Sequence, residues 1–236
     1  MARLTTTLEP NDPSVYTSDK KFDLGGFGVT PDGRKFRYGR QNASTAAIAG
    51  KLYQGGAETT TWQALAIAAS VAGSKTITTT STITATKDQL AGGYVVISTT
   101  PGLGYTYKIV GNTAASGAVC TITLEEAIVV ALTTGTTIDL VADPYSVVEI
   151  WDYSNHDGKV VGVAASAITA AYYGWYQVGG PCGVLVDSGA VAVGVNVYAS
   201  AAVDGSVDAT ATYAYVGTAM TAGSSAEYAM VDLNIN

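Results

Sequence analysis

The second half of the chain alternates short apolar runs with small polar turns almost to its last residue. Residues 184–186 read Val-Leu-Val, residues 190–198 read Ala-Val-Ala-Val-Gly-Val-Asn-Val-Tyr, and residues 228–236 read Tyr-Ala-Met-Val-Asp-Leu-Asn-Ile-Asn. Runs of about 5 to 8 residues rich in Val, Tyr and Thr, bounded by Asp, Ser and Gly, are typical of antiparallel strands. The pattern therefore predicts a carboxy-terminal antiparallel β-barrel or sandwich over residues 144–236.

Threonine alternates with isoleucine in the middle of the chain. Residues 76–84 read Thr-Ile-Thr-Thr-Thr-Ser-Thr-Ile-Thr, and β-branched residues in this arrangement favour half-exposed strands. Pro144 marks a boundary, because the residue before a proline is steered away from helix. We therefore expect a Thr-rich β-domain over residues 57–143.

The amino-terminal part, residues 1–56, divides into an arm and a hairpin. The first twenty residues contain Pro10, Pro13 and many Thr and Ser, with almost no apolar side chains. A segment that buries so little is ordered only where a partner holds it. The composition predicts an extended arm.

A basic hairpin follows the arm. The turn Pro-Asp-Gly-Arg at residues 31–34 joins two strand-like runs, because proline presets the first turn dihedral and glycine accepts a positive one. Phe36 and Tyr38 share one face of the second run. Lys35 and Arg37 share the opposite face. With the other two segments, this hairpin predicts an all-β chain.

Charge is scarce and unevenly placed. Charged residues make up 13% of the chain, and the net charge is -7. Residues 1–51 hold eight basic and five acidic side chains, whereas the rest of the chain holds four basic and fourteen acidic ones. A basic segment of this kind can dock on an acidic protein surface through Arg–carboxylate pairs. We expect no nucleic-acid partner, because the basic residues are spread out and mixed with carboxylates.

Residues suited to catalysis are few. His156 lies in a polar turn, and no Gly-x-Ser-x-Gly motif accompanies it, so a Ser-His-Asp enzyme is not indicated. Glu125 and Glu126 are adjacent and would point to opposite faces of a strand, although carboxylates brought together from distant strands stay open. Cys120 and Cys182 are isolated and indicate neither a disulfide framework nor a metal site. We expect no enzymatic activity, no cofactor and no metal.

Several phrases along the chain share their order with one known family. They read Thr-Pro-Asp-Gly-Arg-Lys-Phe-Arg-Tyr from residue 30, Gly-Gly-Tyr-Val-Val from 92, Gly-Tyr-Thr-Tyr-Lys-Ile from 104, Asp-Pro-Tyr from 143, Ala-Tyr-Tyr-Gly-Trp-Tyr-Gln-Val from 171, and Tyr-Ala-Met-Val-Asp-Leu-Asn-Ile from 228. Their joint order resembles the capsid decoration, or cement, proteins of tailed bacteriophages. The resemblance covers most of residues 30–236 and is weakest before residue 22.

The resemblance implies an accessory β-protein on the outside of an icosahedral phage head. Such proteins often form trimers and clamp neighbouring capsomers, so we expect a structural virion protein that stabilises the shell by bridging major-capsid-protein subunits. The expected partners are that capsid protein and further copies of the chain as a homotrimer. The family has no shared catalytic motif.

The expected sites follow from charge and aromatic content. We expect capsid-binding residues in the basic hairpin, namely Arg34, Lys35, Arg37, Tyr38 and Arg40. Tyr and Trp are enriched at protein interfaces. We therefore expect the oligomer interface in the aromatic cluster of Tyr172, Tyr173, Trp175 and Tyr176.

The sequence shows neither a membrane span nor a secretory signal, and it leaves two alternative functions open. No apolar run approaches the roughly 18 residues of a membrane span, and the first residues lack the apolar core of a secretory signal. We therefore expect assembly in the host cytoplasm and no membrane partner. One alternative function is a phage tail, baseplate or head-fibre component. The other is a carbohydrate-binding β-module that uses Trp175 and its Tyr neighbours.

Overall fold

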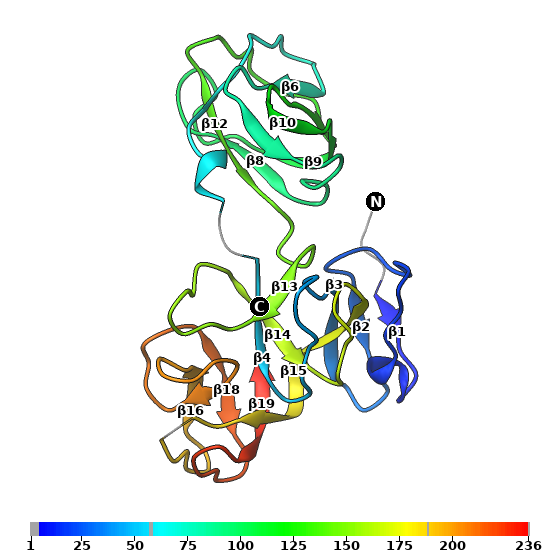
Figure 1. Cartoon of the computed structure of the whole chain (residues 1–236), viewed down its shortest axis with the longest axis vertical. Helices are drawn as coiled ribbons and strands as arrows, with labels where there is room; N and C mark the ends of the chain where they lie inside the picture. The colour runs from blue at the N-terminus through cyan, green and yellow to red at the C-terminus, as the bar shows by residue number, and fades with distance from the viewer. Residues whose placement is uncertain (1–4, 57–58, 188, 236) are drawn as a thin grey trace. The chain divides into compact units, whose positions relative to one another are not determined.

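The computed structural model describes residues 5–56, 59–187 and 189–235. In these residues the regular elements are strands, apart from two short 3-10 helices (Figure 1). The all-β class predicted from the sequence is confirmed.

The chain divides into two compact units rather than three. The larger unit comprises Met1–Ala57 and Pro144–Asn236, and the smaller unit is Glu58–Asp143. The segments 1–56 and 144–236, which the sequence pattern treats as separate, form one unit because their strands pair in one sheet.

The larger unit is built on a sheet with eleven strands among the described residues. Its elements in chain order are β1 (Thr6–Thr7), η1 (Asp12–Ser14), β2 (Phe27–Val29), β3 (Lys35–Arg40), β4 (Leu52–Gly55), β13 (Val148–Ile150), β14 (Val160–Ala164), β15 (Tyr173–Leu185), β16 (Asn196–Ala199), β17 (Val207–Asp208), β18 (Tyr215–Ala219) and β19 (Tyr228–Asn234).

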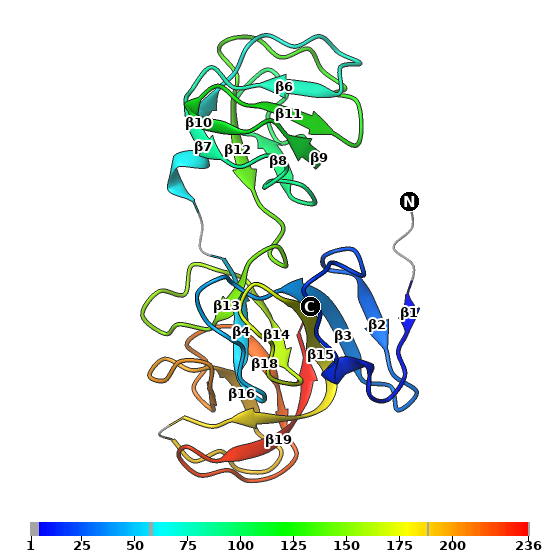
Figure 2. The same ribbon diagram turned by 45° about the vertical axis from the view of Figure 1, so that its right-hand side comes forward.

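Strand β15 is the central strand of this unit and changes partner along its length. Residues 173–179 pair with β3, and residues 179–185 pair with β19 (Figure 2). The change coincides with Gly180, whose φ of 81° lies in the left-handed region that favours glycine.

The side-chain amide of Gln177 holds this bend. The residue is 2% exposed, and its Nε2 donates to the carbonyl oxygens of Gly179 at 3.2 Å, Gly180 at 3.2 Å and Pro181 at 2.8 Å. An amide nitrogen carries two hydrogens, so the three carbonyls share them. The backbone on both sides of the bend is thereby tied to one buried group.

The carboxy-terminal strands curl into a barrel. They follow the order β15-β19-β18-β16-β17, and Val186, just after β15, forms a bridge with Val207 of β17. Strand β19 shows the alternation expected of such a wall, because Ala229, Val231 and Leu233 are buried while the residues between them are exposed. Within residues 144–236, predicted as a barrel or sandwich, strands β15 to β19 form this barrel, whereas β13 and β14 pair with β4 off its path.

The amino-terminal segment packs on its own chain, where the sequence pattern predicts an extended arm. Strand β1 pairs in parallel with β2, and Leu8 is 1% exposed. A Cβ atom on Gly28 would lie 2.6 Å from Leu8 Cδ1, so glycine leaves the space that the leucine fills. Further along, Thr17 exchanges backbone hydrogen bonds with Tyr173 at the start of β15. From residue 5 onward the segment therefore belongs to the fold.

The smaller unit contains a six-stranded sheet and a two-stranded sheet among its described residues. Its elements are η2 (Thr60–Trp62), β5 (Leu65–Ala66), β6 (Thr76–Thr78), β7 (Ile83–Ala85), β8 (Tyr94–Ile97), β9 (Thr106–Asn112), β10 (Ala115–Ala118), β11 (Thr121–Leu124) and β12 (Thr137–Val141).

The six-stranded sheet closes on itself. Its order is β5-β12-β8-β9-β11-β6, and an antiparallel bridge joins Ile67, just after β5, to Thr79, just after β6. The enclosed side chains form a core of their own, which includes Ile77, Ile109 and Ile138, each 0% exposed. The smaller unit has the closed core of an independent domain.

We expect Leu8→Ala to lower the free energy of unfolding of the full chain by about 2–5 kcal/mol, the usual cost of truncating a buried leucine. Denaturant unfolding would measure the loss. Val15→Ala is the control, because Val15 lies in the same segment and is 56% exposed, so its effect should stay within about 0.5 kcal/mol. Equal effects of the two substitutions would contradict the packed position of the segment.

The larger unit should fold without the smaller one. Gly55 lies opposite Val148 in the β4–β13 pair, and the Gly56 amide donates to the Val147 carbonyl at 2.7 Å. The chain thus leaves and re-enters the larger unit on paired antiparallel strands, which a tight turn can join. We expect a chain with residues 58–143 replaced by Gly-Asn-Gly to melt cooperatively in circular dichroism, and residues 58–143 alone to do the same. A non-cooperative melt of either piece would contradict this.

Candidate functional site

The structure brings the two predicted groups of site residues to the neighbouring strands β3 and β15, with Arg34 just before β3 and Tyr172 just before β15. Their register sets Tyr173 opposite Arg40, Trp175 opposite Tyr38, and Tyr176 opposite Arg37. Directly opposed residues of an antiparallel pair share a face of the sheet. The predicted capsid contact and the predicted oligomer contact therefore form one region, divided between two faces.

Tyr38 and Trp175 are core residues. They are 2% and 3% exposed, and their ring centroids lie 5.0 Å apart. Leu8 and Phe36 complete this cluster, and Phe22 lies against it with its ring 5.1 Å from that of Trp175. The predictions of Tyr38 as a capsid contact and of Trp175 as an interface residue are therefore wrong. Both residues are core positions. The alternation of β3 predicts that Phe36 and Tyr38 share a face, but not that the amino-terminal segment covers this face.

The same burial bears on the carbohydrate-binding alternative. A sugar platform needs an exposed aromatic face, and the Trp175 ring is packed among Leu8, Phe36 and Tyr38. Trp175 does not offer that platform in this structure.

Tyr176 occupies the opposite face and is also buried. It is 0% exposed, its hydroxyl donates to Gln41 Oε1 at 2.7 Å, and its ring lies 5.6 Å from that of Tyr53. Burial raises the pKa of Tyr176 well above its usual value. Tyr176 is thus a second correction from interface to core. Tyr172 and Tyr173 are half-buried and keep surface that a partner can reach.

Arg34 is held at the end of the hairpin turn. Its Nε donates to Asp32 Oδ2 at 2.8 Å, and the Thr30 hydroxyl donates to the same carboxylate. These hydrogen bonds, that from Thr30 first, lower the pKa of Asp32. The Arg34 side chain is 29% exposed, and its other N–H donors remain for a partner.

The other predicted cations lie on two faces of β3. Arg37 donates through Nη1 to the Gly25 carbonyl at 3.0 Å. The Arg40 guanidinium lies 5.8 Å from the Tyr173 ring centroid on the other face. Lys35 is exposed and shares the face of Arg37, because side chains alternate along a strand. The four cations therefore do not form a single patch.

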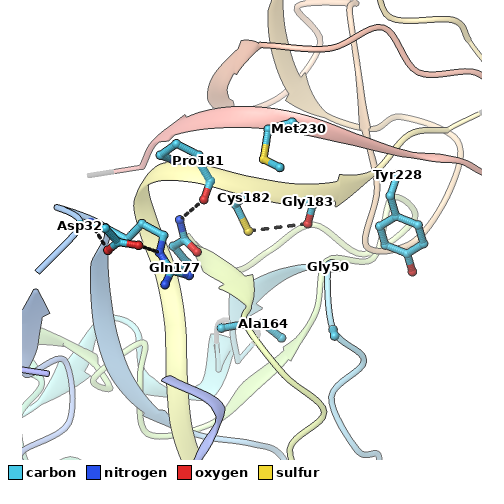
Figure 3. Close-up of a pocket in the computed structure, with 12 residues that line it drawn as sticks. Asp32, Gly50, Ala164, Gln177, Pro181, Cys182, Gly183, Tyr228 and Met230 are labelled. Carbon is cyan, nitrogen blue, oxygen red and sulfur yellow. Dashed lines mark hydrogen bonds and ion pairs between the residues drawn. The ribbon is translucent and has the colours of Figure 1, made fainter. Parts of the chain in front are cut away.

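A groove and a hollow lie beside the basic hairpin. The first, which we call the Arg34 groove, encloses about 690 Å³ and lies between the hairpin turn, β14, β15 and β19 (Figure 3). Its lining includes Arg34, Gln177, Pro181, Cys182, Tyr228 and Met230. Most of this surface is apolar, with the Asp32–Arg34 ion pair at one side.

The second, which we call the Lys35 hollow, has a different character. It encloses about 610 Å³ between β3, β15, β18 and β19. Its polar lining includes Lys35, Arg37, Tyr215, Thr218, Asp232 and Asn234. Two of the five predicted capsid-binding residues thus lie in a polar hollow rather than on a flat strand face.

Neither of these sites holds an activated nucleophile. Burial raises the pKa of the Cys182 thiol to about 12, so the thiol stays protonated and unreactive at neutral pH. The sole histidine, His156, packs in an exposed turn with its ring 4.2 Å from that of Tyr213. Among the residues that the structure describes, no group of three His, Cys, Asp or Glu side chains is placed to hold a metal ion.

Tyr228 and Met230 were not among the residues predicted from the sequence. They are 53% and 41% exposed on β19 and line the Arg34 groove. Strict alternation in residues 228–235 places large apolar side chains on both faces of the strand, and that is the signal that could have identified them.

No protein-family model, no curated protein and no solved structure matches this chain. Within the described residues, no helix has the length and apolar character needed to cross a membrane.

Two buried carboxylates meet in the carboxy-terminal barrel. Asp187 and Asp208 are 4% and 7% exposed. Ser200 Oγ donates to Asp187 at 2.7 Å, and the Thr210 amide donates to Asp208 at 2.7 Å. Burial, with the like charge of Asp187, raises the pKa of Asp208. Asp208 therefore retains its proton to higher pH than an isolated aspartate does.

We expect Asp208→Asn to stabilise the chain more at pH 7 than at pH 4. The folded-state pKa of Asp208 lies above its unfolded value, so its contribution to stability is fully present below the unfolded pKa of about 3.9. That contribution is lost as the pH rises through the folded pKa, and asparagine imitates the protonated acid at every pH. Denaturant unfolding at the two pH values measures the difference.

Asp157→Asn is the control for this experiment, because it removes an exposed carboxylate. Its effect on the free energy of unfolding should be small at both pH values. An Asp208→Asn effect that does not change between pH 4 and pH 7 would show that folding does not raise the pKa of Asp208.

Proposed function

We propose that this chain is a structural protein of a tailed-phage virion that binds the outer surface of the icosahedral capsid. It stabilises the shell by bridging major-capsid-protein subunits. The observation that carries the proposal is the placement of Arg34, Lys35 and Arg37 at the groove and the hollow beside the rigid β3–β15 pair. The resemblance of residues 30–236 to the decoration proteins supports the identity of the partner.

The charge distribution favours docking on an acidic surface. The cations of the hairpin belong to a chain of net charge -7, so an acidic partner is attracted to the hairpin and repelled by the rest of the chain. Arginine also binds carboxylates through two parallel hydrogen bonds, which fixes orientation. Weak contacts of this kind, repeated over many equivalent sites of a shell, add to a large stabilisation.

The oligomer in this proposal is a homotrimer whose contact includes Tyr172 and Tyr173. Tyr16 extends that surface, because it is 43% exposed and its ring lies 6.0 Å from that of Tyr172. Trp175 contributes from beneath by fixing β15, and it does not itself touch the partner.

We expect the triple charge reversal Arg34→Glu, Arg37→Glu and Arg40→Glu to abolish binding to expanded phage heads that lack accessory proteins. Each substitution replaces an arginine, which can bind a carboxylate of the partner, by a glutamate, which repels it. Co-sedimentation with the heads would measure binding, and circular dichroism would verify the fold. The matched control reverses Lys75, Lys87 and Lys159, which are exposed lysines elsewhere, and should bind as the wild type does.

Three outcomes separate the candidate functions. Stoichiometric loading of a discrete trimer with a higher melting temperature of the heads would support the capsid function. Growth of the isolated chain into rings or tubes, with no binding to heads, would assign it to a tail. Full binding by the triple charge reversal would exclude the basic hairpin as the docking element.

A further inference from the structure

We infer that the Lys35 hollow is a carboxylate-binding site that accepts one acidic side chain, aspartate or glutamate, of a protein partner. The inference rests on the proposed docking function and gives it a defined contact. It rests on the shape of the hollow, on the way in which its cations are held, and on the charge of its far wall.

Gly179 belongs to the lining of the hollow, and the stem of Lys35 packs over it. Gly179 pairs with Lys35 of β3 on one side and with Asn234 of β19 on the other, so the three residues form one row across the sheet. A Cβ atom at Gly179 would lie 3.1 Å from Lys35 Cδ. The stem of Lys35 therefore packs over Gly179, in space that a larger side chain at this position would contest.

The cationic wall is held in place before any partner arrives. The Arg37 guanidinium donates to the Gly25 carbonyl at 3.0 Å and lies 4.9 Å from the centroid of the Phe27 ring. A guanidinium held in this way loses little freedom when it binds a carboxylate. The ion pairs among the described residues involve Lys21, Arg34, Lys87 and Lys108. None of these ion pairs uses Lys35 or Arg37, so both cations are available to a partner.

The far wall selects a single carboxylate over a phosphate chain. Asp232 lines the hollow opposite the cations, so two positive charges face one negative charge. A monoanion satisfies this balance, whereas the repeated charges of a nucleic-acid backbone would be repelled by Asp232. Asn234 and Thr218 supply an amide and a hydroxyl that can bond the backbone of the incoming segment.

The hollow also has apolar surface for the stem of the side chain. Phe27 and Tyr215 belong to its lining, and methylene groups pack favourably on such rings. This favours glutamate as the probe, because its stem has one methylene more than that of aspartate.

The test is a titration of the ¹⁵N-labelled full chain with acetyl-Gly-Glu-Gly-amide, followed by NMR. We expect the amide signals of Lys35, Gly179 and Asn234 to shift together, with a dissociation constant on the order of 1 mM. Acetyl-Gly-Gln-Gly-amide should produce no such shift. Lys35→Gln and Lys35→Gln with Arg37→Gln should weaken binding, the double variant by about tenfold or more.

Lys159→Gln is the matched control and should bind the peptide as the wild type does. The single Lys35→Gln variant keeps the test decisive if the double variant is misfolded, because Lys35 is exposed. No glutamate-dependent shift in the wild type would overturn the inference. If an oligothymidylate shifts the same amide signals and binds more tightly than the peptide, the inference is overturned in favour of a nucleic acid.

Head binding is measured separately, so that the two proposals can fail separately. If the Lys35→Gln, Arg37→Gln double variant loads onto phage heads as fully as the wild type does, the inference is overturned. The capsid function then still stands. If the chain binds the peptide at the hollow but does not bind phage heads, the site is supported and the capsid function is overturned.

Discussion

The hydrogen bonds from Gln177 to three successive carbonyls hold the bend at which β15 leaves β3 and joins β19. Before the bend, β15 supports the basic hairpin; after it, the same strand forms one wall of the carboxy-terminal barrel. Gln177 lines the Arg34 groove, and Gly179 and Gly180 line the Lys35 hollow. Removing its amide would leave these carbonyls without that donor, so the geometry of both depends on this one side chain.

The sequence was sufficient for the fold class and for the hairpin, because both depend on local order. Alternation of apolar residues, proline and glycine in the 31–34 turn, and β-branched runs specify strands and turns without distant partners. The pairing of β3 with β15 joins residues more than 130 positions apart, and no local pattern encodes it. Leu8, with the Trp175 ring beside it, fills the space above Gly28, and composition averaged over twenty residues conceals the leucine's contact.

The candidate site was predicted in part for the same reason. The alternation of β3 places Lys35 and Arg37 on one face, and the structure puts both in one hollow. Alternation alone does not say which face is covered. Tyr38 and Trp175 were therefore predicted as surface contacts, and their burial shows that they are not. The far wall of the hollow comes from β18 and β19, near the end of the chain. Asp232 therefore had no visible relation to the hairpin until the strands were paired.

The adjacent exits of β4 and β13 also have a mechanical consequence. The Gly56–Val147 hydrogen bond sits at the end of the strand pair from which residues 57–143 depart. A force that pulls on the inserted unit reaches both strands together and along the same direction, so the hydrogen bonds between them carry little of the load. The load passes instead to the ladder between β4 and β14, in which three residue pairs are in register, and a pull along the strands loads these pairs together in shear. Attachment through a strand pair thus resists traction better than attachment through a single strand would.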